Sequence, residues 1–167
     1  FYWLGAGPAF LVAVQAAVLG LGAVPAYLIA RDRVGNPWVA AVIAYAYLLY
    51  APVQWLTWAN FHPEALVVTP LLFAWWLAGR RHWRRTWLAV GLALICREDV
   101  AMAVAIMGVL LWFTFRRRPD AERRDRRMAL ALAGVGVVWY LVSVRLVIPA
   151  FNRWQQPFYV TGYYGNY

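Results

Sequence analysis

Three consecutive charged residues, Arg97, Glu98 and Asp99, interrupt an otherwise apolar part of the sequence. The runs at 86–96 and 100–115 that flank them contain no ionisable group apart from one thiol, that of Cys96. A charge at the centre of a membrane helix costs about 2.5–3.5 kcal/mol on insertion scales. A charged triplet between two apolar runs is therefore either the tip of a loop or a functional site.

A second charged group, His62 and Glu64, stands immediately before the apolar run at 65–78. Carboxylates and an imidazole on one face can act as a general base or bind a divalent cation. The candidate catalytic residues are therefore Glu98, Asp99, Glu64 and His62, and the identity of any metal stays open. The non-functional alternatives are a loop tip with a capping acid for Arg97–Asp99 and a helix start with a solvated acid for His62–Glu64.

Arginines near these acids could bind a phosphate, because guanidinium groups match phosphate oxygens well. The candidate substrate-binding residues are Arg97, Arg145, Arg153, Gln54 and Tyr50. Arg145 has an alternative explanation as a snorkelling side chain near a membrane boundary. Tyr50, Gln54 and Thr57 would share one helix face if the helix continues past Pro52.

The composition indicates an all-α protein, a polytopic transmembrane helical bundle. Of the 167 residues, 64% are apolar and 14% charged, whereas soluble domains contain about 25% charged residues. The sequence does not begin with Met. We expect a single transmembrane domain over residues 1–167, which is a fragment of a longer multi-span protein.

Separate apolar runs predict about six membrane segments, because each can form a helix of membrane-spanning composition. They cover residues 9–30, 38–58, 63–78, 86–96, 100–115 and 128–148. Pro25 predicts a kink near the end of the first segment, and Pro52 interrupts the second.

The charge distribution predicts an orientation. Alternating segments place the connections 31–37, 79–86 and 116–127 on one side, with thirteen Arg against four acids, whereas the other side carries three of each. By the positive-inside rule the basic side is cytoplasmic, in a multi-pass protein of the plasma membrane. The charges lie in connections, so we expect contact with membrane lipid and no nucleic-acid partner.

Run lengths predict that the triplet lies below the outer membrane surface. The runs at 86–96 and 100–115 would reach only about 17 Å and 24 Å as helices, less than the ~30 Å of hydrocarbon. Irregular backbone at that depth requires protein or a water-filled cavity around it. We expect a polar cavity that opens outward, with Asp99 or Glu98 capping the following helix.

Four short motifs resemble an uncharacterised family of predicted membrane proteins of bacteria and archaea. They are Ala23-Val24-Pro25-Ala26-Tyr27-Leu28-Ile29-Ala30-Arg31, Phe61-His62-Pro63-Glu64-Ala65-Leu66, Arg97-Glu98-Asp99-Val100 and Val147-Ile148-Pro149-Ala150-Phe151-Asn152. Members of that family look like distant relatives of the GT-C glycosyltransferases, which use polyprenyl-phosphate sugars at the outer membrane face. GT-C enzymes carry an acidic motif in their first outer loop. No such loop is present here, so either it lies upstream or the relationship is remote.

The resemblance implies a GT-C-like membrane glycosyltransferase of the hexosyltransferase type, with a polyprenyl-phosphate-linked sugar as partner. Glu98 and Asp99 would then act as base or metal contacts, with a divalent cation as the one cofactor to consider. His62 and Glu64 would line the acceptor side. Two alternatives remain: a transporter or flippase of a lipid-linked substrate, and a non-enzymatic membrane scaffold.

Overall fold

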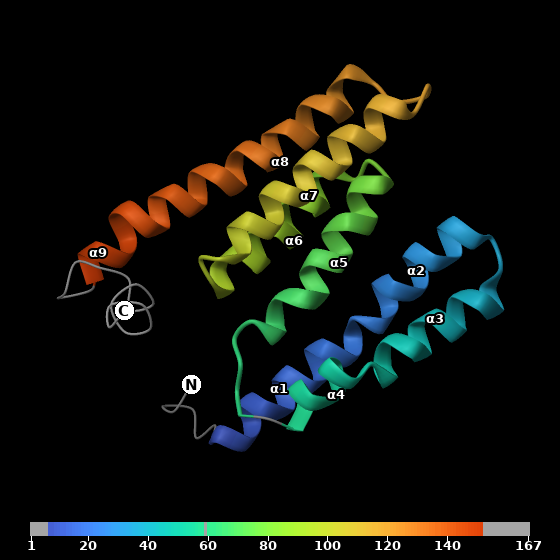
Figure 1. The fold of residues 1–167 in the computed structure, drawn as a ribbon. Coiled ribbons are helices and arrows are strands. Elements are labelled where there is room, and N and C mark those ends of the chain that lie inside the picture. Colours follow the sequence, from blue (N-terminus) through green and yellow to red (C-terminus); the bar gives the residue numbers. More distant parts are fainter. Residues whose placement is uncertain (1–6, 59, 152–167) are drawn as a thin grey trace, which may run out of the picture. The chain divides into compact units, whose positions relative to one another are not determined.

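The computed structural model describes residues 7–58 and 60–151, and every regular element in these ranges is helical. The chain divides into two compact units, residues 1–97 and 98–167, and the helices of each are labelled in Figure 1. The first unit contains helices α1 to α6, and the second contains α7, α8, a π-helical segment η2 and α9.

The first helix is interrupted between α1 (Pro8–Leu21) and α2 (Ala23–Val34). The break falls at Gly22, three residues before the proline at which the sequence predicts a kink. Pro25 has no N–H to donate to the preceding turn, so the helix is weakened before the proline rather than at it. The Tyr47 hydroxyl donates to the Leu19 carbonyl at 2.9 Å, and a side chain on Gly22 would collide with the Tyr47 ring.

The second helix is also broken, into α3 (Pro37–Leu49) and α4 (Ala51–Trp58), with a bend of 51°. Asn36 caps α3 by accepting hydrogen bonds from two backbone N–H groups. At the break, Pro52 has no N–H for the Leu48 carbonyl, and the Gln54 side-chain amide donates to that carbonyl at 2.6 Å instead. Gln54 and Thr57 belong to α4, whereas Tyr50 stands at the break, so the face expected from one continuous helix is interrupted at Tyr50.

Helices α5 (Ala65–Gly79) and α6 (Trp83–Cys96) form an antiparallel pair, and α5 also packs on α1 and α2. Where α5 ends, Arg80 forms a bidentate ion pair with Asp32 at 2.7 and 2.9 Å. The Trp76 indole N–H donates to the same carboxylate at 2.9 Å. This Asp32 clasp ties the end of α2 to the end of α5 at the end of the unit where its arginines gather, which we call the basic end.

The second unit is a hairpin of α7 (Val100–Arg117) and α8 (Arg123–Val142), and α8 continues through η2 (Ser143–Val147) into α9 (Ile148–Phe151). Glu122 and Asp125 form a capping box at the start of α8. The π-helical segment ends two residues before Pro149, which cannot donate the hydrogen bond of a regular α-helical turn.

Glycines allow the backbones of α7 and α8 to approach closely. A Cβ on Gly108 would lie 2.7 Å from the Ala129 carbonyl oxygen, and one on Gly136 would lie 2.6 Å from the Ala101 carbonyl oxygen. Such reciprocal contacts of small residues are typical of helix pairs in membranes.

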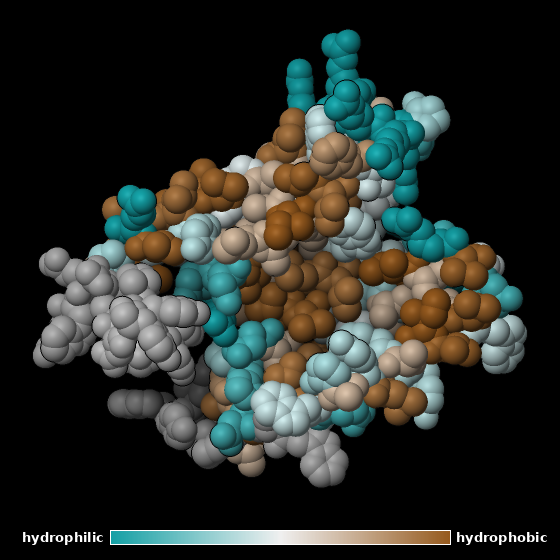
Figure 2. All heavy atoms as spheres, in the orientation of Figure 1, coloured by the Kyte–Doolittle hydropathy of each residue, from teal (hydrophilic) through white to brown (hydrophobic). Residues whose placement is uncertain are grey.

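The membrane character of the chain is confirmed by length, composition and surface. In the described part, Ala9–Val34, Val100–Arg117 and Arg123–Ala150 are long and apolar enough to cross a membrane, and the bent pair α3–α4 would be a fourth. Large apolar side chains stand on the surface, such as Trp38 at 81% exposure and Ile95 at 80%. Hydrophobic residues form large brown areas on the face shown in Figure 2. The expected segments at 63–78 and 86–96 form helices of about 22 Å and 21 Å, so six spans stay a prediction.

Candidate functional site

Glu64 lies between His62 and Arg97 at the end of the first unit opposite the basic end. Glu64 directly precedes α5 and Arg97 directly follows α6, so the antiparallel pairing of these helices brings them together. Arg97 Nη1 lies 3.2 Å from Glu64 Oε2, and His62 Nδ1 lies 3.3 Å from Glu64 Oε1. We call these three residues the Glu64 cluster, and all three were predicted as site residues from the sequence.

The turn that carries His62 is held by Gln15 of α1, whose side chain is fully buried. Gln15 Oε1 accepts the His62 backbone N–H at 2.6 Å, and its Nε2 donates to the Leu56 carbonyl at 2.5 Å. The Trp55 ring lies 5.9 Å from the imidazole, centre to centre. Gln15 is missing from the sequence-based candidates, although an amide inside an apolar run is a signal for a buried polar contact.

Glu64 is stabilised in its ionised form. Its pKa is lowered chiefly by the hydrogen bond to its own backbone N–H, and further by Arg97 and His62, against the opposing effect of partial burial. The cluster therefore holds a carboxylate at neutral pH, and a carboxylate fixes the orientation of a neighbouring imidazole by accepting its N–H.

Acid should weaken this cluster. A folded-state pKa below the usual value of 4.5 means that Glu64 contributes stability above that pH, which is lost as the pH falls through the folded-state pKa. The effect should stay below about 1 kcal/mol because the pair is partly exposed. Thermal unfolding in detergent should show a loss below pH 4.5 that is smaller in Glu64→Gln. Equal pH profiles for the two proteins would contradict the role of Glu64.

Glu98 and Asp99 belong to the second unit, where Asp99 occupies the N-cap position of α7. The Asp99 side chain makes no capping hydrogen bond, so the cap expected from the sequence is not formed by this residue. That Glu98 and Asp99 lie close to His62 and Glu64 stays a prediction.

The remaining candidates are spread over the chain. Arg145 lies exposed in η2, and Tyr50 stands 61% exposed at the α3–α4 break. Gln54 is engaged with the backbone at that break, and Arg153 lies outside the described residues. Within residues 7–58 and 60–151, no three His, Cys, Asp or Glu side chains form a group that could hold a metal ion.

A family model confirms the predicted-membrane-protein family that the motifs indicate. The family model described as "Predicted membrane protein (DUF2079)" matches residues 1–167. The chain belongs to this family. No curated protein and no solved structure matches the chain.

Membership of the DUF2079 family confirms the predicted-membrane-protein resemblance seen in the motifs that contain His62, Glu64 and Arg97. It also agrees with the apolar helices and with contact to membrane lipid. The DUF2079 description names no activity, so it carries no evidence for a GT-C relationship.

Proposed function

We propose that this chain is part of a GT-C-like membrane glycosyltransferase that uses a polyprenyl-phosphate-linked sugar. The observation that carries the proposal is the Glu64 cluster, in which one carboxylate contacts both an imidazole and a guanidinium. An imidazole oriented by a carboxylate suits proton abstraction, and a guanidinium suits a phosphate.

In the proposed reaction, His62 acts as the general base. When Nδ1–H donates a hydrogen bond to Glu64, Nε2 is the ring nitrogen that can accept the proton of an acceptor hydroxyl. The acceptor oxygen then attacks the anomeric carbon of the sugar as the bond from that carbon to the phosphate oxygen breaks. The polyprenyl phosphate leaves with the electron pair, and Arg97 stabilises its charge.

Roles for Glu98 and Asp99 as base or metal contacts, and for Arg145 and Arg153 as phosphate contacts, stay predictions from the sequence, because these residues do not belong to the first unit. Tyr50 and Gln54 would line the substrate side.

The short reach of α5 and α6 supports a lipid-linked substrate. Helices α5 and α6 would reach only about 22 Å and 21 Å from the basic end, short of the ~30 Å hydrocarbon thickness. In an arrangement of six spans with the connections 31–37, 79–86 and 116–127 in the cytoplasm, the Glu64 cluster is recessed below the outer surface. There it can meet a phosphate linked to a lipid chain.

The experiment is sugar transfer by the full-length protein in vesicles with a polyprenyl-phosphate sugar and an acceptor. His62→Gln and Glu64→Gln should each lower the rate at least about 100-fold, the usual contribution of general-base catalysis. His82→Gln is the matched control, because His82 lies at the α5–α6 turn at the basic end. Unchanged product with His62→Gln would end the catalytic assignment.

The broken helices favour a second candidate, a transporter or flippase of a lipid-linked substrate. Discontinuous helices are typical of transporter binding sites, and the first unit has such a break at Tyr50, where α3 and α4 meet at a bend of 51°. In the same vesicles a flippase would move the lipid-linked sugar across the bilayer without forming a glycosylated product. A scaffold would do neither.

A further inference from the structure

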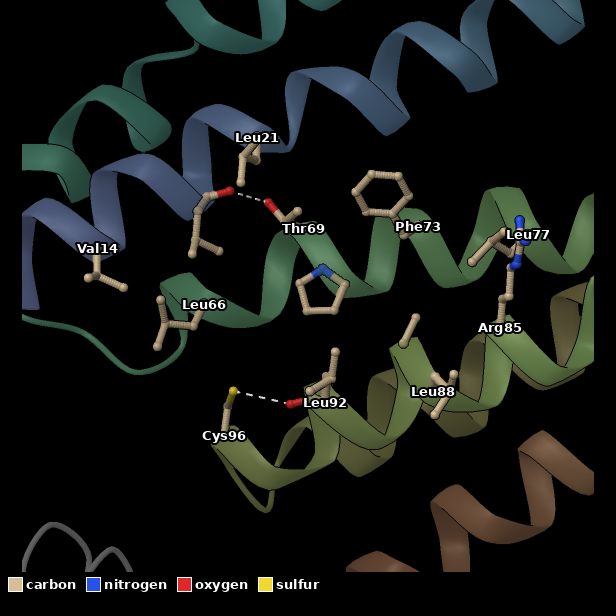
Figure 3. Close-up of a pocket in the computed structure, with 13 residues that line it drawn as sticks. Val14, Leu21, Leu66, Thr69, Phe73, Leu77, Arg85, Leu88, Leu92 and Cys96 are labelled. Carbon is tan, nitrogen blue, oxygen red and sulfur yellow. Dashed lines mark hydrogen bonds between the residues drawn. The ribbon is translucent and has the colours of Figure 1, made fainter.

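Helices α1, α5 and α6 line an open groove of about 560 Å³ in the first unit (Figure 3). It is lined by Val14, Val18, Leu21, Leu66, Thr69, Pro70, Phe73, Leu77, Arg85, Leu88, Ala89, Leu92 and Cys96. The Thr69 hydroxyl donates a hydrogen bond to the Val18 carbonyl at 2.5 Å. That hydroxyl proton is therefore not available to a ligand in the groove. The result is an apolar surface with a single charged side chain, Arg85.

The groove has the length of one lipid chain in one leaflet. On α5 it extends from Leu66 to Leu77, which corresponds to about 16 Å of helix, or half of the ~30 Å hydrocarbon core. Its α6 edge is open, since Leu88 is 70% exposed and Leu92 is 63% exposed. An acyl chain could therefore enter sideways from the bilayer.

The one charge lies at the basic end of the groove. Figure 3 shows Arg85 and Cys96 at opposite ends. Arg80 of the adjoining turn is held by Asp32, whereas no ion pair or hydrogen bond joins the Arg85 side chain to another described residue. A guanidinium at the end of an apolar groove complements a phosphate with an attached hydrocarbon chain.

We propose that this groove binds an anionic glycerophospholipid from the leaflet that faces the basic end. The phosphate lies on Arg85, and one acyl chain lies between α5 and α6 with its end toward Cys96. Burial of the acyl chain supplies affinity, and Arg85 selects the headgroup charge. This site is separate from the proposed glycosyl transfer, whose phosphate contact, Arg97, lies at the opposite end of the unit.

Cys96 provides a built-in readout, because it is the only cysteine of the chain and lines the groove. The chain is reconstituted in vesicles of phosphatidylcholine alone or with added phosphatidylglycerol, and labelling of the thiol by an apolar maleimide is followed. Phosphatidylglycerol should slow labelling several-fold. Native mass spectrometry should show phosphatidylglycerol retained in preference to phosphatidylcholine.

Arg85→Gln should abolish both effects, with about tenfold weaker retention, as expected for loss of a charge-assisted contact. The matched control is Arg84→Gln, because Arg84 carries the same charge one position away and does not line the groove. Leu92→Trp should also fill the groove and displace the lipid, whereas Ile95→Trp, on the same helix but outside the lining, should not.

Three results would overturn the proposal. Equal labelling of Cys96 in both vesicle types would exclude headgroup selection. Sensitivity to Arg97→Gln instead of Arg85→Gln would indicate a lipid with its phosphate at the other end, such as polyprenyl phosphate. Protection of Cys96 regardless of lipid would indicate that another part of the protein fills the groove.

Discussion

Replacing Gly136 with leucine should separate α7 from α8 and lower the free energy of unfolding by about 3 kcal/mol, the upper range for overpacking. A Cβ at this position would meet the backbone of α7, 2.6 Å from the Ala101 carbonyl oxygen and 2.5 Å from the Ala105 nitrogen. Backbone atoms cannot move aside as a flexible side chain can, so the helices themselves must shift. Gly108→Leu should have a comparable effect because Gly108 makes the reciprocal contact with α8.

The matched control is Gly134→Leu. Gly134 lies on the same helix only two residues away, but a Cβ there would meet no atom within 4 Å. This substitution should be neutral or stabilising by up to about 1 kcal/mol, since leucine has the higher helix propensity. Unfolding in mixed micelles with increasing SDS measures the difference. Equal losses at positions 134 and 136 would contradict the close backbone contact.

Gln15→Leu should be the most damaging single change near the Glu64 cluster. The leucine would leave the His62 N–H and the Leu56 carbonyl without their present partner. An unsatisfied buried polar group costs about 1–3 kcal/mol, so the loss for these two groups should be about 2–6 kcal/mol. Because Gln15 fixes the turn without touching Glu64, this variant should also misplace His62 and reduce any activity that depends on it.

Gln54→Leu is the matched control for this change. Gln54 also bonds a backbone carbonyl, that of Leu48, but its side chain is exposed. Its loss should cost less than about 1 kcal/mol. Thermal unfolding of both variants in the same detergent decides the comparison. If Gln15→Leu proved as mild as Gln54→Leu, the buried amide would not organise the turn.

The sequence predicts helix positions well because apolar runs bounded by charged or proline-containing turns leave few alternatives. The expected segment at 100–115 corresponds to α7, and that at 63–78 corresponds closely to α5. The breaks are less predictable. A proline removes a hydrogen bond one turn earlier in the chain, so Pro25 and Pro52 are associated with breaks at Gly22 and Tyr50.

For the site as well, contacts between residues close in the sequence are easier to predict than contacts between distant ones. His62 and Glu64 are near neighbours in the sequence. The position of Arg97 beside them can be predicted because the start of one helix and the end of its antiparallel neighbour lie on the same side. Gln15 lies 47 residues from its partner His62, and no local pattern connects them. The packing of α7 on α8 had a readable signal, since Gly108 and Gly136 each end a series of small residues spaced three or four positions apart.

The Asp32 clasp has a consequence for biosynthesis. Arg80 follows Asp32 by 48 residues, so at 5–20 residues per second the ribosome adds it roughly 2–10 s later. During that interval α2 and α3 can already be inserted while Asp32 still lacks Arg80 and Trp76. The first helices must therefore remain in the membrane before their connection to α5 exists. The Asp32 clasp can form only after α5 and Arg80 have been synthesised.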